Sequence, residues 1–266
     1  MNIILVHGIL GFRKIGAIDY FLDVAQHFKA KGYLPFAPQL DPTQGISFRG
    51  DQLRRQIEQA FISKALDPQQ KTHIIAHSMG GLDSRYMLSP ANLNRIQIPI
   101  TSLTTIGTPH LGSPIADVID NPAALLPFPH LPFASPMTTL VPFLNALGIS
   151  ENGLRDLRTG SCQAFSAKYV DNPNVRYFSC AGSGRLGLTA TAGVFMIFHH
   201  YISGTTGESN DGLVAVSSAK WGVFDPTTWP CDHAEEVGHN LDNLLQPTPF
   251  PYLDKYDEIV NRAAAL

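Results

Sequence analysis

Residues 72–81 of the chain have the sequence THIIAHSMGG and decide the fold that we predict. The apolar first half of this stretch is typical of the end of a buried strand, and residues 80–88 are typical of the start of a helix. Ser78 then lies on a sharp turn, where the small residues Ala76 and Gly80 keep the helix from colliding with the strand. This is the strand–turn–helix setting of a nucleophile elbow, normally written G-x-S-x-G. The alternative is a serine that only caps a helix after a strand.

The composition limits the class of protein. A length of 266 residues suits one α/β domain or two small ones, and 44% hydrophobic residues are enough for a large core. The formal net charge of -3 and the lack of a basic run exclude nucleic acid as an expected partner. We expect no membrane-spanning segment. Cys162, Cys180 and Cys231 are predicted to be buried without a disulfide.

The start of the sequence bears on localisation. The first predicted strand begins at Asn2, so the sequence as given contains no signal peptide. We therefore expect a cytoplasmic protein. A secreted protein is the alternative if the chain is a trimmed mature form.

Strands and helices alternate along the chain. The predicted strands are residues 2–6, 34–40, 100–106 and 175–180, together with the strand that ends at residues 74–76 before Ser78. The predicted early helices are residues 19–31 and 48–66. This alternation predicts a single α/β domain over residues 1–266, with a mostly parallel central sheet and helices on both faces. Prolines in residues 34–40 place that strand near an edge of the sheet.

One segment departs from the alternation. Residues 114–149 are crowded with Pro, Phe and Leu, and they carry almost no charge after Asp120. We interpret this segment as a lid or cap over a cleft that accepts lipid, with its mobile helix near residues 138–147. The alternative is a helical insertion that packs on the sheet.

A serine nucleophile needs a base, an acid that orients the base, and donors for the oxyanion. In α/β hydrolases these residues follow in the order Ser, acid, His. After Ser78, the best acid is Asp211, which precedes a glycine in a loop, and the best base is His233. The competing residues have weaker settings; they are Asp225, Asp232, His199, His200 and His239.

The oxyanion hole requires two N–H groups. The backbone N–H of Met79 supplies one, at the start of the helix that follows Ser78. The other is expected from the loop after the first strand. Residues 7–11, HGILG, have the H-G-x-x-G form of this loop, which makes the N–H of Ile9 the second donor. A plain glycine turn is the alternative.

Several blocks of sequence occur in the order found in a known family. The blocks are residues 7–12 with 19–20, 49–53, 77–81 with 85–86, 107–113, 165–169, 175–178, and 210–214 with 217–218. In these blocks the chain resembles the bacterial triacylglycerol lipases of the Pseudomonas, Burkholderia and Proteus type, in the α/β-hydrolase fold. The resemblance covers most of the chain, and the NDGLV block at 210–214 is fairly specific. It implies that Asp211 is the triad acid and that His233 is the base.

The chain also departs from that family. The elbow begins with Ala76 where the family usually has Gly, and no cysteine follows Asp211 at the usual place. Secreted members hold a structural calcium through an Asp before the triad acid and oxygens after the histidine. Here residues 188–201 contain no carboxylate, Glu235 matches one ligand, and His239 falls where an oxygen ligand is expected. Because a hard cation needs several oxygens, we expect no cofactor and no metal, and a structural calcium is the disfavoured alternative.

Together these features predict a serine carboxylic ester hydrolase, a lipase or esterase, that cleaves esters of apolar acyl chains through an acyl-enzyme. An acyltransferase or a polyester depolymerase with the same triad is the first alternative, and a catalytically inactive lipid-binding protein is a remote one. The expected partners are an ester or lipid substrate and a lipid interface. The sequence leaves acyl-chain length and oligomeric state open.

Overall fold

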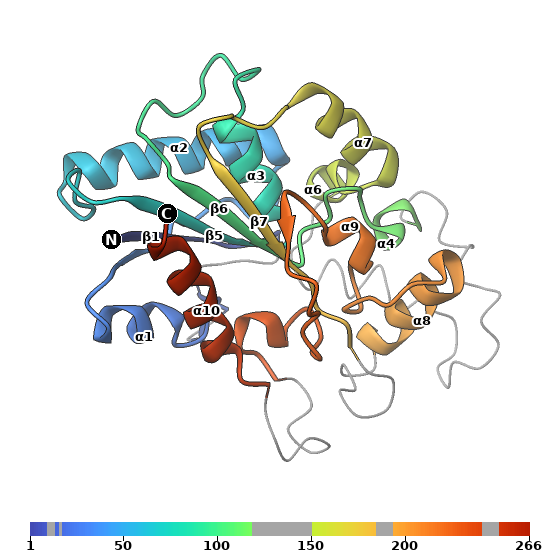
Figure 1. Ribbon diagram of the computed structural model, residues 1–266. Helices are drawn as coiled ribbons and strands as arrows, with labels where there is room; N and C mark the ends of the chain where they lie inside the picture. The colour runs from blue at the N-terminus through green and yellow to red at the C-terminus, as the bar shows by residue number, and fades with distance from the viewer. Residues whose placement is uncertain (10–13, 16–17, 119–150, 185–193, 241–249) are drawn as a thin grey trace.

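The computed structural model describes the chain except at residues 10–13, 16–17, 119–150, 185–193 and 241–249 (Figure 1). A six-stranded sheet with the order β4-β1-β5-β6-β7-β8 forms its centre, and every neighbouring pair in it is parallel. The strands are β1 (Asn2–Val6), β4 (Leu34–Phe36), β5 (Thr72–His77), β6 (Ser102–Ile106), β7 (Arg176–Cys180) and β8 (Val223–Phe224). The short strands β2 (Lys14–Ile15) and β3 (Ile18–Asp19) pair antiparallel with each other.

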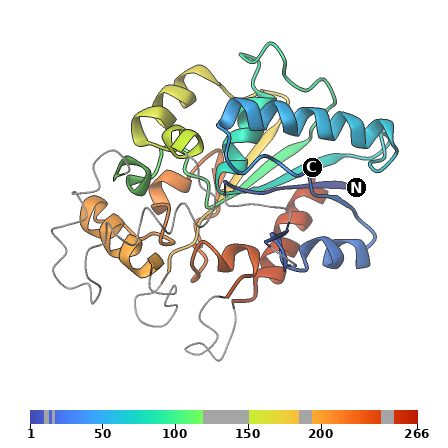
Figure 2. The same ribbon diagram turned by 180° about the vertical axis from the view of Figure 1, so that it is seen from behind.

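Helices cover both faces of the sheet, as Figures 1 and 2 show from opposite sides. On one face lie α1 (Val24–Ala30) and α10 (Tyr252–Ala264), and on the other lie α2 (Ile46–Ile62) and α3 (Met79–Leu88). The remaining described helices are α4 (Pro114–Asp117), α6 (Glu151–Asp156), α7 (Thr159–Lys168), α8 (Val194–Thr206), α9 (Val216–Ala219) and the short 3₁₀ helix η3 (Glu235–Val237). The predicted α/β architecture, a mostly parallel sheet with helices on both faces, is thereby confirmed.

Strand β1 shows why the sheet is buried on both faces. Successive side chains of a strand point to opposite faces, so the continuous apolar run of β1 supplies both layers of the core. Ile3 and Leu5 pack in the cluster that contains residues of α1 and α10. Ile4 and Val6 pack in the cluster that contains residues of α2 and α3. Each of these fully buried side chains contributes about 1.5–3 kcal/mol to stability.

Several predicted boundaries are wrong by a few residues. The helix predicted to begin at residue 19 begins at Val24, because Asp23 adopts a left-handed conformation with φ 54°. The helix predicted to end at residue 66 ends at Ile62, shortly before Lys64 at φ 61°. Strand β4 is shorter than the predicted residues 34–40, and it lies at the edge of the sheet as expected from its prolines.

The beginning of the predicted lid is described as a short helix. Helix α4 starts after Ser113, whose side chain accepts a hydrogen bond from the N–H of Ile115. The rest of the predicted lid, including the predicted mobile helix at residues 138–147, lies outside the described residues. Among the helices that the structure describes, none combines the length and the apolar character needed to cross a bilayer.

Candidate active site

Ser78 lies on the turn between β5 and α3, as predicted, in a backbone conformation that few residues other than glycine adopt. Its φ is 56° and its ψ is -134°. Such a conformation costs about 1–3 kcal/mol, so the surrounding structure must hold it in place. Three hydrogen bonds do so: the Ser78 N–H donates to Ile106 O at 2.9 Å, and the Ser78 carbonyl accepts from Gly81 N at 3.1 Å and from Thr108 Oγ1 at 2.7 Å.

The small residues around the turn have a clear physical reason. A Cβ atom at Gly80 would lie 2.5 Å from the carbonyl oxygen of Val6 and 2.8 Å from that of His7. The first turn of α3 therefore packs directly on the backbone at the end of β1. Ala76, where the resembling family usually has Gly, is fully buried in the core cluster on the α2 and α3 side.

The loop after β1 runs against the serine. A Cβ atom at Gly8 would lie 2.7 Å from Ser78 Cβ and 3.0 Å from Ser78 Oγ. Ile9, the next residue, is buried in one apolar cluster with Met79. Within the described part of the chain, the N–H groups of Ile9 and Met79 donate to no acceptor. The two predicted oxyanion donors thus flank the predicted nucleophile from two different strand ends.

Asp211 and His233 lie together, as predicted. His233 Nδ1 is 2.7 Å from Asp211 Oδ2, and the other carboxylate oxygen, Oδ1, accepts the N–H groups of Leu213 at 2.8 Å and Val214 at 2.7 Å. Both side chains are buried. Because a carboxylate accepts, Nδ1 carries the ring proton and Nε2 is left with a free lone pair in the neutral ring. His233 is therefore in the tautomer that a general base requires.

His233 also lies beside the end of β5 that leads into Ser78. Its ring centroid is 4.4 Å from that of His77, the residue that immediately precedes the serine. The structure thus brings the predicted acid and base together, next to the strand end that carries the predicted nucleophile.

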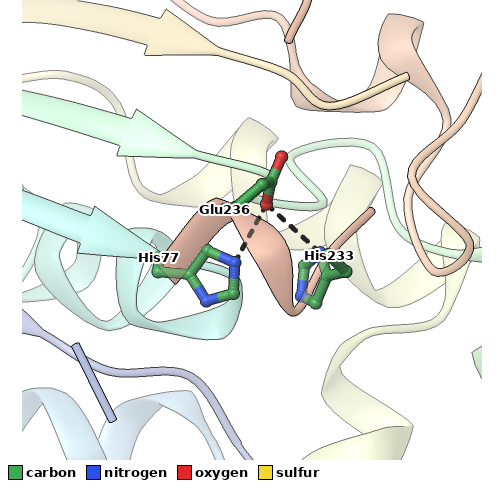
Figure 3. A group of neighbouring side chains, drawn as sticks. All are labelled: His77, His233 and Glu236. Atoms are coloured by element: carbon green, nitrogen blue, oxygen red, sulfur yellow. Dashed lines mark hydrogen bonds and ion pairs between the residues drawn. The ribbon is translucent and has the colours of Figure 1, made fainter. Parts of the chain in front are cut away.

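A second buried carboxyl group, which the sequence analysis missed, lies between these histidines (Figure 3). Glu236 Oε2 is 2.9 Å from His77 Nε2 and 3.5 Å from His233 Nδ1, and Glu236 Oε1 accepts the N–H of Gly182 at 2.7 Å. Burial, together with the nearby charge of Asp211, raises the pKa of Glu236 well above its usual range. The site therefore favours a neutral Glu236 beside the charged Asp211.

Glycines from distant strands make room for Glu236. A Cβ at Gly107 would lie 2.2 Å from Glu236 Oε2, and a Cβ at Gly182 would lie 2.8 Å from Glu236 Oε1. The available sequence signal is the acidic pair Glu235 and Glu236 after His233, of which only Glu235 was considered, as a calcium ligand.

His77, His233 and Glu236 are also the described residues that could hold a metal ion, since their ligand atoms lie within 4.8 Å of one another. Both ring nitrogens involved already have hydrogen-bond partners, Glu236 for His77 and Asp211 for His233. The residues considered for calcium have other contacts. Glu235 Oε2 accepts the N–H of Asp232 at 3.1 Å, and His239 Nε2 lies 2.8 Å from the Tyr20 carbonyl oxygen.

The competing acids and bases have structural contacts. His199 lies in α8, as expected, with Nε2 3.2 Å from the Gly184 carbonyl oxygen. Asp232 Oδ1 accepts the N–H groups of Ala234 and Glu235 and so fixes the turn after His233. Burial raises the pKa of Asp232 to about 7.

Known proteins resemble this chain in sequence and in fold. A family model described as "Putative serine esterase (DUF676)" matches residues 3–119. Triacylglycerol lipase 2 of Saccharomyces cerevisiae is 30% identical over 237 residues, which cover 86% of this chain and 64% of the yeast protein. A triacylglycerol lipase of Pseudomonas fragi is 28% identical over 267 residues, which cover 89% of this chain and 87% of that protein. The structure of lipase 1 from Pelosinus fermentans covers all of this chain with a TM-score of 0.71 at 18% identity, and 98% of that chain is matched.

Proposed function

We propose, from the premise that this chain is a relative of proteins named triacylglycerol lipase with an α/β-hydrolase fold, that it is a serine carboxylic ester hydrolase. The chain spans only 64% of the length of the yeast relative, so the activity is argued from the site itself. The observation that carries the proposal is the buried Asp211–His233 pair, with Nδ1 2.7 Å from Oδ2, beside the strained turn at Ser78.

In the proposed reaction, Ser78 Oγ attacks the ester carbonyl carbon and His233 Nε2 takes the hydroxyl proton. The Asp211 carboxylate keeps the imidazole oriented and stabilises the imidazolium that forms. The C–O bond of the ester then breaks, and His233 returns the proton to the leaving alcohol. In the second half of the reaction, a water oxygen attacks the acyl carbon while His233 Nε2 takes a proton from that water. The bond between the acyl carbon and Ser78 Oγ then breaks, and His233 returns the proton to Ser78 Oγ.

The negative charge on the carbonyl oxygen needs stabilisation in both steps. The N–H groups of Ile9 and Met79 are the proposed donors, because both residues flank Ser78 and neither N–H has an acceptor within the described residues. One such donor is worth about 10²–10³ in kcat.

The proposed substrates are esters of apolar acyl chains. Two observations support this class: the relatives are named triacylglycerol lipase, and the two proposed oxyanion donors belong to an apolar cluster that also contains Ile46, Leu82 and Tyr86. The residues that pack on this side of Ser78 are therefore apolar, as an acyl-binding site requires. Turnover of a series of p-nitrophenyl esters of increasing acyl length tests the substrate class.

The decisive experiment combines turnover with covalent labelling. A fluorophosphonate should label the wild-type chain, and Ser78→Ala should remove both the labelling and ester hydrolysis while the circular dichroism spectrum stays unchanged. A residual rate of about 10³-fold over water would remain from the other groups of the site. Near-normal turnover by folded Ser78→Ala would overturn the proposal, and an unlabelled wild-type chain would favour a lipid-binding protein.

A further inference from the structure

The loop formed by residues 7–9, here called the oxyanion loop, is held by buried side chains that the proposed reaction does not use. It contains two peptide groups, one between His7 and Gly8 and one between Gly8 and Ile9. The second of these carries the N–H of Ile9. Each of the two peptide groups has a hydrogen bond to a buried side chain, His7 in one case and Tyr20 in the other.

The hydrogen bonds of His7 define its tautomer. The N–H of Leu40 donates to His7 Nε2 at 2.9 Å, so Nε2 is an acceptor. Burial and the nearby positive charge of Arg49 lower the pKa of His7 to about 3, which keeps the ring neutral at ordinary pH. The ring proton is therefore on Nδ1, and it is donated to the Gly8 carbonyl oxygen at 2.9 Å.

This bond acts on the group that carries the Ile9 N–H. The Gly8 carbonyl and the Ile9 N–H belong to one planar trans peptide, in which the two bonds point in opposite directions. A hydrogen bond that fixes the carbonyl consequently fixes the direction of the N–H. Donation to the carbonyl also polarises the peptide and strengthens the N–H as a donor.

Tyr20 holds the preceding peptide. The N–H of Gly8 donates to Tyr20 Oη at 3.2 Å, and Tyr20 Oη lies 2.6 Å from His77 Nδ1. Because a backbone N–H can only donate, the hydroxyl accepts from Gly8, and its second hydrogen bond is with His77 Nδ1. On the other side of its ring, His77 Nε2 shares a hydrogen bond with Glu236 Oε2 at 2.9 Å. Tyr20 thereby connects the oxyanion loop to the residues that surround His233.

The close approach requires glycine at position 8. A Cβ there would lie 3.0 Å from Tyr20 Oη as well as 2.7 Å from Ser78 Cβ. The same backbone is therefore in contact with the serine on one side and with the tyrosine hydroxyl on another. The carbonyl of His7, on the peptide whose N–H binds Tyr20, accepts from Arg49 Nη2 at 2.9 Å.

We propose that His7 and Tyr20 are positioning residues for the oxyanion hole: their hydrogen bonds to the two peptide groups of the oxyanion loop aim the Ile9 N–H at the developing oxyanion. The inference rests on the proposed ester hydrolysis. It gives two buried polar side chains a role in transition-state stabilisation that needs no contact with substrate.

The test at position 7 compares two amides. In His7→Asn the side-chain NH₂ can occupy the place of Nδ1 and donate to the Gly8 carbonyl, whereas the longer His7→Gln places its amide near the position of Nε2. We expect His7→Asn to keep kcat within about threefold, and His7→Gln to lose about 10- to 100-fold, below the loss for a whole oxyanion donor. KM should stay within about twofold, because the N–H acts on the transition state.

The test at position 20 has a matched control in the same core cluster. Tyr20→Phe removes the acceptor of the Gly8 N–H, and we expect kcat to fall about tenfold with little change in KM. Tyr256 is also buried, and its hydroxyl has no hydrogen-bond partner within the described residues. Tyr256→Phe should therefore leave kcat unchanged.

Binding of an alkyl boronic acid, an analogue of the tetrahedral intermediate, separates positioning from general damage. Its affinity should fall in His7→Gln and Tyr20→Phe by the same factor as kcat/KM, measured per folded molecule. The inference is overturned if both variants keep wild-type kcat and boronate affinity, or if they lose only thermal stability. Fluorophosphonate labelling of the wild-type chain separately tests the proposed function, so the two can fail independently.

Discussion

Replacing Asp211 by Asn tests the proposed triad through the tautomer of His233. Asp211 Oδ1 accepts two backbone N–H groups, those of Leu213 and Val214, and Oδ2 accepts the His233 Nδ1 proton. In Asp211→Asn the amide oxygen keeps the two backbone donors, so its NH₂ group takes the place of Oδ2. That group donates to Nδ1, moves the ring proton to Nε2, and removes the lone pair that accepts the Ser78 proton.

The expected loss in kcat is about 10⁴, equivalent to about 5 kcal/mol of transition-state stabilisation. The fold should be retained, since both backbone hydrogen bonds remain. The assay is hydrolysis of a soluble p-nitrophenyl ester, together with the proton NMR signal of His233 Nδ1–H. That signal should be present in the wild-type chain and absent from the variant.

The matched control is Glu236→Gln, a change of similar shape in the neighbouring carboxyl group. Glu236 Oε2 lies 3.5 Å from His233 Nδ1, against 2.7 Å for Asp211, and burial favours its neutral form. We therefore expect a loss of at most about tenfold, far below that of Asp211→Asn. If a folded Asp211→Asn variant instead keeps kcat within about tenfold of wild type, or if Glu236→Gln is the more damaged variant, the assignment of the acid is refuted.

Three further predictions concern packing, metal and lipid. Gly80→Ala should lower the free energy of unfolding by about 1–3 kcal/mol in urea titrations, because the new Cβ would lie 2.5 Å from the Val6 carbonyl oxygen. The control is Gly160→Ala in α7, where a Cβ would meet nothing within 4 Å, so this change should be neutral or stabilising. EDTA should change neither activity nor melting temperature; a melting temperature that falls in chelator and recovers with calcium would contradict this. With a short-chain ester, the rate of hydrolysis should jump above the solubility limit of the ester. A lid that exposes a few hundred Å² of apolar surface, at about 25 cal/mol per Å², costs several kcal/mol in water, and a lipid surface offsets most of that cost. Making Leu140, Phe143 and Leu144 polar should abolish that jump, and a smooth saturation curve would mean that the segment is a fixed cap.

The sequence was sufficient for the features that depend on local pattern. The apolar run of β1 predicts a strand covered on both faces, and Ile3 and Ile4 indeed pack in different core clusters. Ser78 is found on the predicted turn, because the requirement for small residues around it is visible in a few consecutive letters. Helix ends were less predictable. Asp23 and Lys64 adopt left-handed conformations that the apolar periodicity does not reveal.

The parts of the site that the sequence did not reveal depend on contacts between distant segments. Helix η3 buries both acids that follow His233, Glu235 and Glu236. Only the contacts of each carboxyl group distinguish their roles. The space for the Glu236 carboxylate exists because Gly107 and Gly182 lack a side chain. No local pattern around residue 236 contains that information.

The fold supports a site whose strained and buried polar groups cost stability. The strained turn at Ser78 and the buried polar groups of His77 and Glu236 all lie at the carboxyl ends of parallel strands. Buried polar groups are destabilising unless their hydrogen bonds are satisfied, and here each carboxyl oxygen of Glu236 has a partner, His77 on one side and Gly182 on the other. A change that removes one partner leaves the next group in the chain of bonds unsatisfied. Losses from single substitutions along Tyr20, His77 and Glu236 should therefore not add, and a double-mutant cycle between Tyr20→Phe and Glu236→Gln should give a coupling energy of about 0.5–3 kcal/mol in unfolding experiments.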